Sequence, residues 1–215
     1  MLINLRNALM TSGKKPAYWG LCFTAEEAGS TIALMKVSSA PAVTLQTSTD
    51  GKSWMPYTIG DVITLGAIGD SVFFAAGEDG NTGLGSSISR YHQFSMTGKI
   101  AATGNIMSLL SADEPQMQIT GTYTFFKLFY GCTSLTTAPE LPATTLATYC
   151  YQQMFYGCTS LSDIKVYFTA WGSQTTNWVN GVAASGVFEC PDALPHTASD
   201  FTTSKIPPGW TVETF

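Results

Sequence analysis

The residue types that carry acid, base or nucleophilic chemistry are few in this sequence and lie far apart. Its two histidines, His92 and His196, fall in a strand-like run and in a proline-flanked loop. A serine, cysteine or threonine nucleophile needs a positioned base within hydrogen-bond reach, and neither histidine lies in such a constellation. The sequence also lacks the G-x-S-x-G and H-E-x-x-H motifs and a phosphate-binding glycine loop. We therefore expect a protein that is not an enzyme.

Paired carboxylates are the one catalytic alternative, because two facing carboxyl groups can hydrolyse a glycosidic bond. The adjacent acids of this chain are Glu26 with Glu27 and Asp113 with Glu114. Adjacent side chains point in opposite directions along a strand, so such pairs are usually solvated and separate. A glycosidase stays open as the form that an enzymatic activity would take.

Five cysteines raise the questions of disulfides and metal binding. Cys132 and Cys158 occupy equivalent repeat positions, and stacking would place them about 4.8 Å apart, where a disulfide is feasible. We expect free thiols that line the core instead, since the cysteine total is odd and no C-x-x-C pair occurs. Glu78, Asp79 and Asn81 offer oxygen ligands for calcium, but their spacing matches no established calcium loop and favours a solvated turn. We predict no metal and no cofactor.

Composition and charge limit the classes of partner. Charged residues make up 12 % of the 215-residue chain, which holds 29 Thr and 20 Ser. Hydroxyl-rich composition of this kind suits β-structure with neutral surfaces. The net charge is −5 and there is no basic stripe, so we expect no nucleic-acid binding. No apolar run reaches the roughly 18 residues that a membrane span needs, so we expect no membrane insertion.

The front of the chain, from Tyr18 to Met96, has a β pattern. Runs rich in Val, Ile, Thr and aromatic residues are separated by DG and GD turns. In LQTSTDGKSWMPYTI, the pair Asp50–Gly51 lies between two strand-like runs, which is a strong hairpin signal. The pattern predicts a compact antiparallel sandwich.

The heptapeptide FYGCTSL occurs twice, at 129–135 and 155–161, within copies offset by 26 residues. After the second copy, Leu161, Ile164 and Val166 give the spacing L-x-x-I-x-V, which leucine-rich repeats use for a short parallel strand. Before it, buried-type residues lie at i, i+3, i+4 and i+7 over 151–158, which predicts one face of a helix. Each unit is therefore predicted to be a short helix and a strand that must stack on a neighbour.

Further units flank these two copies. A degenerate third copy puts Trp178 in the place of Met154, and Phe188 and Cys190 in the places of Ile164 and Val166. Upstream, GNIMSLL predicts an entry strand near 106–110, and the other strands are expected near 135–138, 161–166 and 187–190. Because Pro139 cannot donate to a strand ladder, the strand of the first copy should be distorted or end early.

These residues carry a family resemblance. GCTSL after an aromatic segment, and LTTAPELPATTLA between copies, resemble the BspA-like leucine-rich repeats of Bacteroidales and of the phages that infect them. NWVNGV, CPDALP and IPPGWTVETF are similar to the closing cap of such proteins. YWGLCFTAEEAGSTIAL, STDGKSW and FSMTGKIAATGNIMSLL resemble the Ig-like module that precedes those repeats. The resemblance covers nearly the whole chain, and it is specific for fold and lineage but weak for the ligand.

The resemblance implies a mainly β fold, with an N-terminal antiparallel Ig-like β-sandwich followed by a short BspA-type leucine-rich repeat solenoid of short helices and parallel strands. Leu2, Leu5 and Leu9 form one face of a possible short helix, which either packs on the body or anchors the chain in a larger assembly. The predicted parts are an anchoring segment at 1–17, the Ig-like sandwich at 18–97, and the repeat domain with its cap at 98–215.

Residues between the apolar positions of a leucine-rich strand face outward and are the candidate ligand-binding surface. Hydroxyls and a few charges suit hydrogen bonds to sugars or polar loops, and repeat-equivalent tyrosines would add an aromatic row that stacks on sugar faces. The alternative is that these residues only keep the surface soluble. The candidates are Thr136, Thr137, Glu140, Ser162, Asp163, Lys165, Glu189, Tyr130 and Tyr156.

Members of the resembled family serve mainly as adhesion and interaction surfaces, whereas Asn4, Arg6 and Asn7 interrupt any secretory signal. We therefore expect a virion protein of a Bacteroidales phage, made in the host cytoplasm: a head or tail fibre or decoration component. Its expected partners are other virion proteins, through the N-terminal segment, and host-surface or mucus glycan or protein, through the repeats. A homo-oligomer, a purely structural decoration protein and an exported bacterial BspA-like adhesin stay open.

Overall fold

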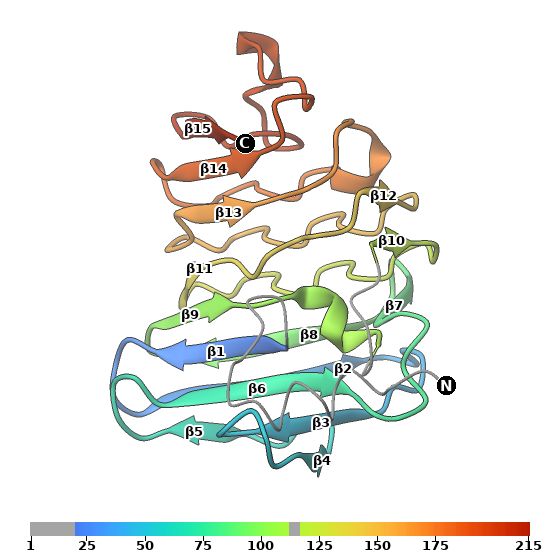
Figure 1. The fold of residues 1–215 in the computed structure, drawn as a ribbon, viewed down its shortest axis with the longest axis vertical. Helices are drawn as coiled ribbons and strands as arrows, with labels where there is room; N and C mark the ends of the chain where they lie inside the picture. Colours follow the sequence, from blue (N-terminus) through green and yellow to red (C-terminus); the bar gives the residue numbers. More distant parts are fainter. Residues whose placement is uncertain (1–19, 112–116) are drawn as a thin grey trace.

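The computed structural model describes residues 20–111 and 117–215. This part is mainly β, with strands in four sheets and three short 3-10 helices, which confirms the predicted fold class at that level. Two sheets, antiparallel except for one parallel pair, form the base of the molecule, and units with short parallel strands stack above them toward the C-terminus (Figure 1). Leu2, Leu5, Leu9, Asp113 and Glu114 lie outside the described residues.

The larger base sheet has six strands, of which residues 20–103 supply five. β11 (Leu135–Thr137) comes from the first repeat copy and pairs in parallel with β9 (Ile100–Thr103), while the other pairs are antiparallel. β3 (Leu45–Ser48) and β4 (Met55–Tyr57) flank Asp50–Gly51, which confirms the predicted hairpin. Gly51 takes the left-handed φ of 67° that suits glycine in a turn. The strand order is β11 (Leu135–Thr137), β9 (Ile100–Thr103), β1 (Leu21–Ala25), β6 (Ser71–Ala76), β3 (Leu45–Ser48), β4 (Met55–Tyr57).

The smaller base sheet packs face to face on the larger one. Phe94 of this sheet meets Phe23 and Phe74 of the other, with ring centroids 4.9 and 5.5 Å apart. All three rings are buried, so the apolar face of each sheet is covered by the other. The strand order is β5 (Ile63–Leu65), β2 (Ser30–Val37), β8 (Arg90–Thr97), β7 (Gly85–Ser87). We call residues 20–103 the two-sheet base.

Parallel strands above the base recur once per repeat unit, and we call residues 117–215 the repeat stack. Leu161, Ile164 and Val166 are fully buried, as the L-x-x-I-x-V spacing predicts. β11 ends at Thr137, two residues before Pro139. This agrees with the expected early end of the strand, because proline has no backbone N–H to donate. The parallel strands are β13 (Asp163–Lys165), β14 (Val187–Cys190) and β15 (Thr211–Thr214) in one sheet, and β10 (Gln118–Ile119) with β12 (Thr145–Leu146) in another.

The helix predicted over 151–158 is wrong, because this segment is a succession of tight turns. The Met154 N–H donates to the Tyr151 carbonyl three residues back, at 3.0 Å. The next N–H, of Phe155, donates instead to the Trp178 carbonyl of the following unit, at 2.8 Å. Backbone donors thus alternate between a local turn and the neighbouring unit, so stacking replaces the helical ladder.

A left-handed residue at every fourth position explains why no helix forms. In the second copy these residues are Tyr149, Gln153 and Gly157, with φ of 59°, 53° and 75°. The first copy has the same conformation at Tyr123 and Lys127. Such a backbone buries positions i, i+4 and i+7 as a helix does, so the spacing alone could not separate the two structures.

The entry strand predicted near 106–110 is also wrong. Ile106–Leu109 forms the 3-10 helix η1, where the Asn105 side chain caps the helix by accepting the Met107 N–H at 2.8 Å. The strand next to the first copy is β9, which ends before this cap. The other 3-10 helices are η2 (Ser173–Thr175) and η3 (Ala198–Asp200).

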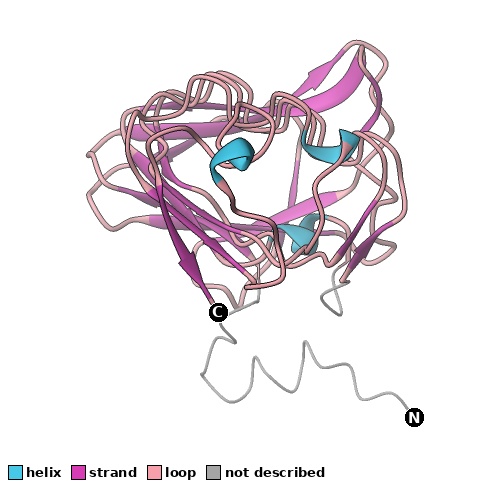
Figure 2. Cartoon of the chain, turned by 90° about the horizontal axis from the view of Figure 1, so that it is seen from above, coloured by secondary structure: helices cyan, strands magenta, loops and turns pink. Residues whose placement is uncertain are grey.

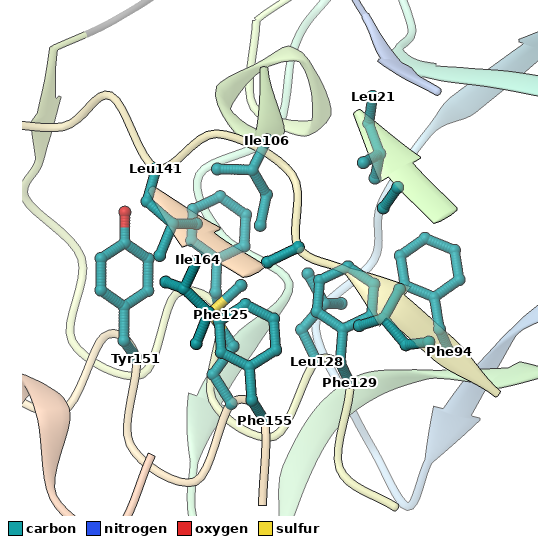
Figure 3. Packing of buried hydrophobic residues seen from close by; sticks show 14 of the residues in the cluster. Leu21, Phe94, Ile106, Phe125, Leu128, Phe129, Leu141, Tyr151, Phe155 and Ile164 are labelled. Carbon is teal, nitrogen blue, oxygen red and sulfur yellow. The ribbon is translucent and has the colours of Figure 1, made fainter. Parts of the chain in front are cut away.

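A column of aromatic rings joins the two-sheet base to the repeat stack. Phe94 of β8 stacks on Phe129 at 5.3 Å, Phe129 stacks on Phe155 at 5.5 Å, and Trp178 follows at 5.9 Å. All four side chains belong to one buried cluster, and Figure 3 shows Phe94, Phe129 and Phe155 within it. Seen from above, successive units run nearly on top of one another (Figure 2). Phe94 therefore takes the place that a preceding repeat would fill.

The cysteines follow the same stacking. The Cys158 thiol donates to the Phe129 carbonyl at 2.9 Å, and the Cys132 thiol donates to the Phe94 carbonyl at 3.1 Å. All five cysteines are free and buried, which confirms the predicted thiols. Burial raises the pKa of Cys132 to about 12, so this thiol stays protonated and acts as a small core residue.

Phe155→Ala tests the aromatic column. The ring is fully buried between Phe129 and Trp178, so its removal leaves a cavity. We expect a loss of about 3–5 kcal/mol in the free energy of unfolding, measured by urea titration. The half-buried Thr137→Ala should cost much less, and equal small losses at both positions would mean that the stacking register is misplaced.

Tyr151→Phe is the matched control within the same unit. The Tyr151 hydroxyl is buried and has no hydrogen-bond partner among the described residues, and the ring stacks on its repeat equivalent Phe125. Removing an unsatisfied buried hydroxyl leaves the packing intact, so this variant should be as stable as the parent or more stable. A loss as large as that of Phe155→Ala would contradict the described environment of the hydroxyl.

Candidate functional site

Strand alternation gives the repeat stack an outward column of charged side chains. In the parallel sheet Lys165 lies in register with Glu189, and Glu189 with Glu213. The intervening Ile164 and Phe188 are fully buried. Because successive strand residues point to opposite faces, the charged residues face away from the core. We call Asp163, Lys165, Glu189 and Glu213, with Glu140 beside Lys165, the polar face.

Lys165 is the centre of this face. Its ammonium lies 3.2 Å from a Glu189 carboxylate oxygen, and both side chains are about a third exposed, at 30 % and 32 %. The same ammonium lies 5.1 Å from the Phe215 ring centroid and 5.8 Å from that of Tyr167. An ion pair this exposed contributes only about 0–1 kcal/mol to stability. Its groups therefore remain available to a ligand at little cost to the fold.

Burial, together with the excess of acids over the one cation, raises the pKa of two carboxyl groups of the polar face. Burial raises the pKa of Asp163, Glu189 and Glu213 raise it further, and Lys165 opposes them. Burial also raises the pKa of Glu140, with Lys165 again opposing and Glu189 adding to the rise. With four acids and one cation, the face is negative when its carboxyl groups are ionised, which favours neutral or cationic ligands over acidic ones.

The threonines and serine predicted as candidates lie in different surroundings. The Thr136 hydroxyl donates to a Glu26 carboxylate oxygen at 2.9 Å, so it joins the repeat stack to the two-sheet base. Thr137 is half-buried beside it. Ser162 is exposed at the edge of the polar face. Thr136 is thus committed to a structural contact, whereas Ser162 is accessible.

Tyr130 and Tyr156 lie in the turn segments, away from the polar face. Their rings stack on each other with centroids 5.0 Å apart and an interplanar angle of 8°, and both are half-buried. Tyr123 and Tyr149 stack in the same way at 5.2 Å. In each pair, the inner face of one ring is covered by the other ring. The predicted stacking on sugars is therefore limited to the outer faces and edges of this tyrosine column.

Several residues that contact one another at the surface could not be identified from the sequence. The Lys127 ammonium lies 4.7 Å from the Tyr130 ring centroid, and it also contacts Tyr91 and Phe126. Lys127 fell inside the predicted helix, and Tyr91 lies in a separate strand, so only the stacked geometry brings them together. Glu213 and Phe215 reach the polar face because β15 adds one more parallel strand, for which the L-x-x-I-x-V spacing gave no signal. Tyr167 lies beside Lys165 on the same segment, two residues further along the chain.

Each candidate for acid–base chemistry hydrogen-bonds to a different part of the chain. His92 is buried with Nδ1 2.9 Å from the Leu84 carbonyl, and burial lowers its pKa. His196 Nδ1 lies 2.7 Å from the Leu194 carbonyl. Glu26 accepts from Thr136, as described above. Each of these groups has a local partner that accounts for its position.

In the loop considered for calcium, the side-chain amide of Asn81 holds neighbouring segments of backbone together. The Asn81 side chain accepts the Thr44 N–H at 2.9 Å and donates to the Leu109 carbonyl at 2.8 Å. Residues 20–111 and 117–215 contain no group of three His, Cys, Asp or Glu placed to hold a metal ion. In the same residues, no helix is long and apolar enough to cross a membrane.

The chain matches no family model, no curated protein and no solved structure.

Removing a charge from the polar face should stabilise the protein at neutral pH. The pKa of Asp163 is raised above its usual 3.8, so the folded state holds this proton more tightly than the unfolded state. Its stabilising contribution is present below the usual pKa and is lost as pH rises through the raised value. Asp163→Asn should therefore raise the thermal midpoint at pH 7 and flatten its decline from pH 4 to 7, measured by circular dichroism.

Glu78→Gln is the control for that experiment, because Glu78 is an exposed acid in a loop of the two-sheet base. It changes the net charge by the same amount without touching the polar face. Equal effects of Asp163→Asn and Glu78→Gln would show that overall charge, rather than crowding on the polar face, sets the pH dependence.

Proposed function

We propose that the protein is a non-enzymatic virion surface protein of a phage that infects Bacteroidales, and that its repeat stack adheres weakly and multivalently to host-surface or mucus glycans or proteins. In this proposal the two-sheet base is an Ig-like sandwich and the repeat stack is a short BspA-type leucine-rich repeat solenoid. Residues 1–17 dock the chain to other virion proteins.

The single observation that carries the adhesion proposal is the polar face. Hydrogen-bonding carboxylates, one ammonium and two aromatic rings lie together on an open sheet surface, around Lys165, Tyr167 and Phe215. Hydrogen bonding combined with aromatic packing suits a polyhydroxylated ligand. An open face without deep burial suits weak contacts, which many copies on one particle would convert into strong attachment.

The repeat architecture supports the solenoid assignment. One short parallel strand follows each unit, and backbone donors of each turn segment bond to the next unit. Turns stand where the sequence predicts helices, and short irregular segments opposite the strands still satisfy the stacking of such repeats. The two packed antiparallel sheets of the base support the Ig-like assignment.

Binding of multivalent protein to host capsular glycan tests adhesion. The full chain is biotinylated, displayed on streptavidin, and titrated onto immobilised host capsular glycan. We expect the double variant Lys165→Ala, Glu189→Ala, which keeps the net charge, to weaken binding at least about tenfold. The control Lys52→Ala, Glu78→Ala keeps the same net charge on the two-sheet base and should bind as the parent does.

Three outcomes would each contradict a part of the proposal. Equal binding by both double variants would remove the polar face from adhesion. Absence of the protein from purified particles, measured by mass spectrometry, would end the virion assignment. Presence in particles with the polar face covered by neighbouring subunits would point instead to a structural decoration protein.

A further inference from the structure

The outer edge of β15 (Thr211–Thr214) is an unpaired strand edge. β15 pairs with β14 on one side, and it ends the order β13-β14-β15, so no described strand pairs with its other side. Thr211, Glu213 and Thr214 are exposed. An edge of this kind offers backbone donors and acceptors to an added strand.

The backbone register shows which groups face this edge. The Thr211 N–H donates to the Gly186 carbonyl at 2.9 Å, and the Phe215 N–H donates to the Cys190 carbonyl at 3.2 Å, both on the β14 side. Backbone groups alternate in direction along a strand, so the N–H and C=O groups of Val212 and Thr214 point to the open side. A parallel strand added here would use the Val212 carbonyl and the Thr214 N–H.

Three other sheet edges in the described residues carry proline, irregular pairing or short length, whereas the protective feature of β15 is the charge of Glu213. β4 has Pro56 at its centre, and β7 has a register shift between Gly85 and Ser87. β5 is only three residues long. Proline, irregularity and short length are the usual means of blunting an edge. β15 has four residues with regular pairing to β14 over its whole length.

Charge indicates the chemistry of the added strand. Along the outward column, Lys165 lies between Glu140 and Glu189, while Glu213 follows Glu189 directly. Among the described residues Glu213 makes no ion pair. Opposite charges in register stabilise neighbouring strands and like charges oppose pairing. A second copy of this acidic chain is therefore a poorer occupant than a strand with a cation in register with Glu213.

We propose that the outer edge of β15 binds an extended peptide segment of a partner protein, added as a parallel strand with a lysine or arginine in register with Glu213 and an apolar residue in register with Val212. The chain's own β13 has this pattern, because Ile164 and Lys165 stand in register with Phe188 and Glu189. This site goes beyond glycan adhesion, since it takes a peptide through the backbone of one strand.

A synthetic peptide tests the site in the full chain. The probe is residues 162–167, Ser-Asp-Ile-Lys-Val-Tyr, with blocked ends and a fluorophore, and its counterpart has glutamate in place of the lysine. Fluorescence anisotropy should show the lysine probe binding about tenfold tighter than the glutamate probe. In Glu213→Lys this preference should reverse, which separates a register contact from general charge attraction.

Hydrogen exchange provides the second measurement. The lysine probe should slow exchange at the Val212 and Thr214 amides, because those N–H groups face the added strand. Thr214→Pro removes one of these donors without touching the bonds to β14, and it should abolish binding. Thr214→Ala is its matched control and should bind as the parent does. Circular dichroism checks that both variants are folded.

Three results would overturn the proposal. Equal affinity of both probes for the parent and for Glu213→Lys would exclude charge register. A charge preference without slowed exchange at Val212 and Thr214 would mean surface attraction rather than strand addition. Protection of those two amides in the free protein, rising with protein concentration, would assign the edge to a second copy of the chain.

Discussion

The backbone edges that the two-sheet base presents to the first repeat unit are the constraint on which the rest of the structure depends. The Phe94 N–H of β8 donates to the Leu128 carbonyl at 2.7 Å, and the Ile100 N–H of β9 donates to the Ser134 carbonyl at 2.9 Å. The first repeat unit thus continues both base sheets at once. Its turn segment bonds to β8 of the smaller sheet, and its strand segment bonds to β9 of the larger sheet. Each later unit repeats this arrangement on the unit below it, so the base acts as a template for the stack.

This stacking also determines where surface chemistry gathers. Because units superpose in register, residues that are far apart in the chain, such as Lys165 and Glu213, are set in one column. The same register pairs Tyr130 with Tyr156 on the turn side. A short parallel stack therefore turns a few residues per unit into continuous rows, and it leaves one open strand edge at β15. Both the polar face and this edge follow from a backbone pattern rather than from a preformed pocket.

Much of the stack could be predicted from the sequence, because an offset of 26 residues identifies stacked positions without knowledge of the backbone. Phe129 over Phe155 follows from it directly. The helix could not be distinguished from four-residue turns, since both bury the same spacing, and left-handed residues such as Gln153 carry no sequence signal comparable to glycine. The repeat spacing identified Lys165 and so a part of the polar face. The position of Phe215 next to Lys165 could not be predicted, because it depends on the pairing of β15. The role of Phe94 depends on long-range sheet pairing that local patterns do not encode.

The template role of the two-sheet base is tested most directly by expressing residues 99–215 alone and following urea unfolding by tryptophan fluorescence, beside the full chain. The fragment keeps Trp178 and the three later units but loses Phe94 and the β8 edge. We expect a single cooperative transition for the full chain and none for the fragment, because about three stacked units are the minimum for stability and the fragment lacks the β8 edge and the Phe94 ring that cover the turn segment of its first unit. A cooperative, monomeric transition of the fragment would contradict the template role.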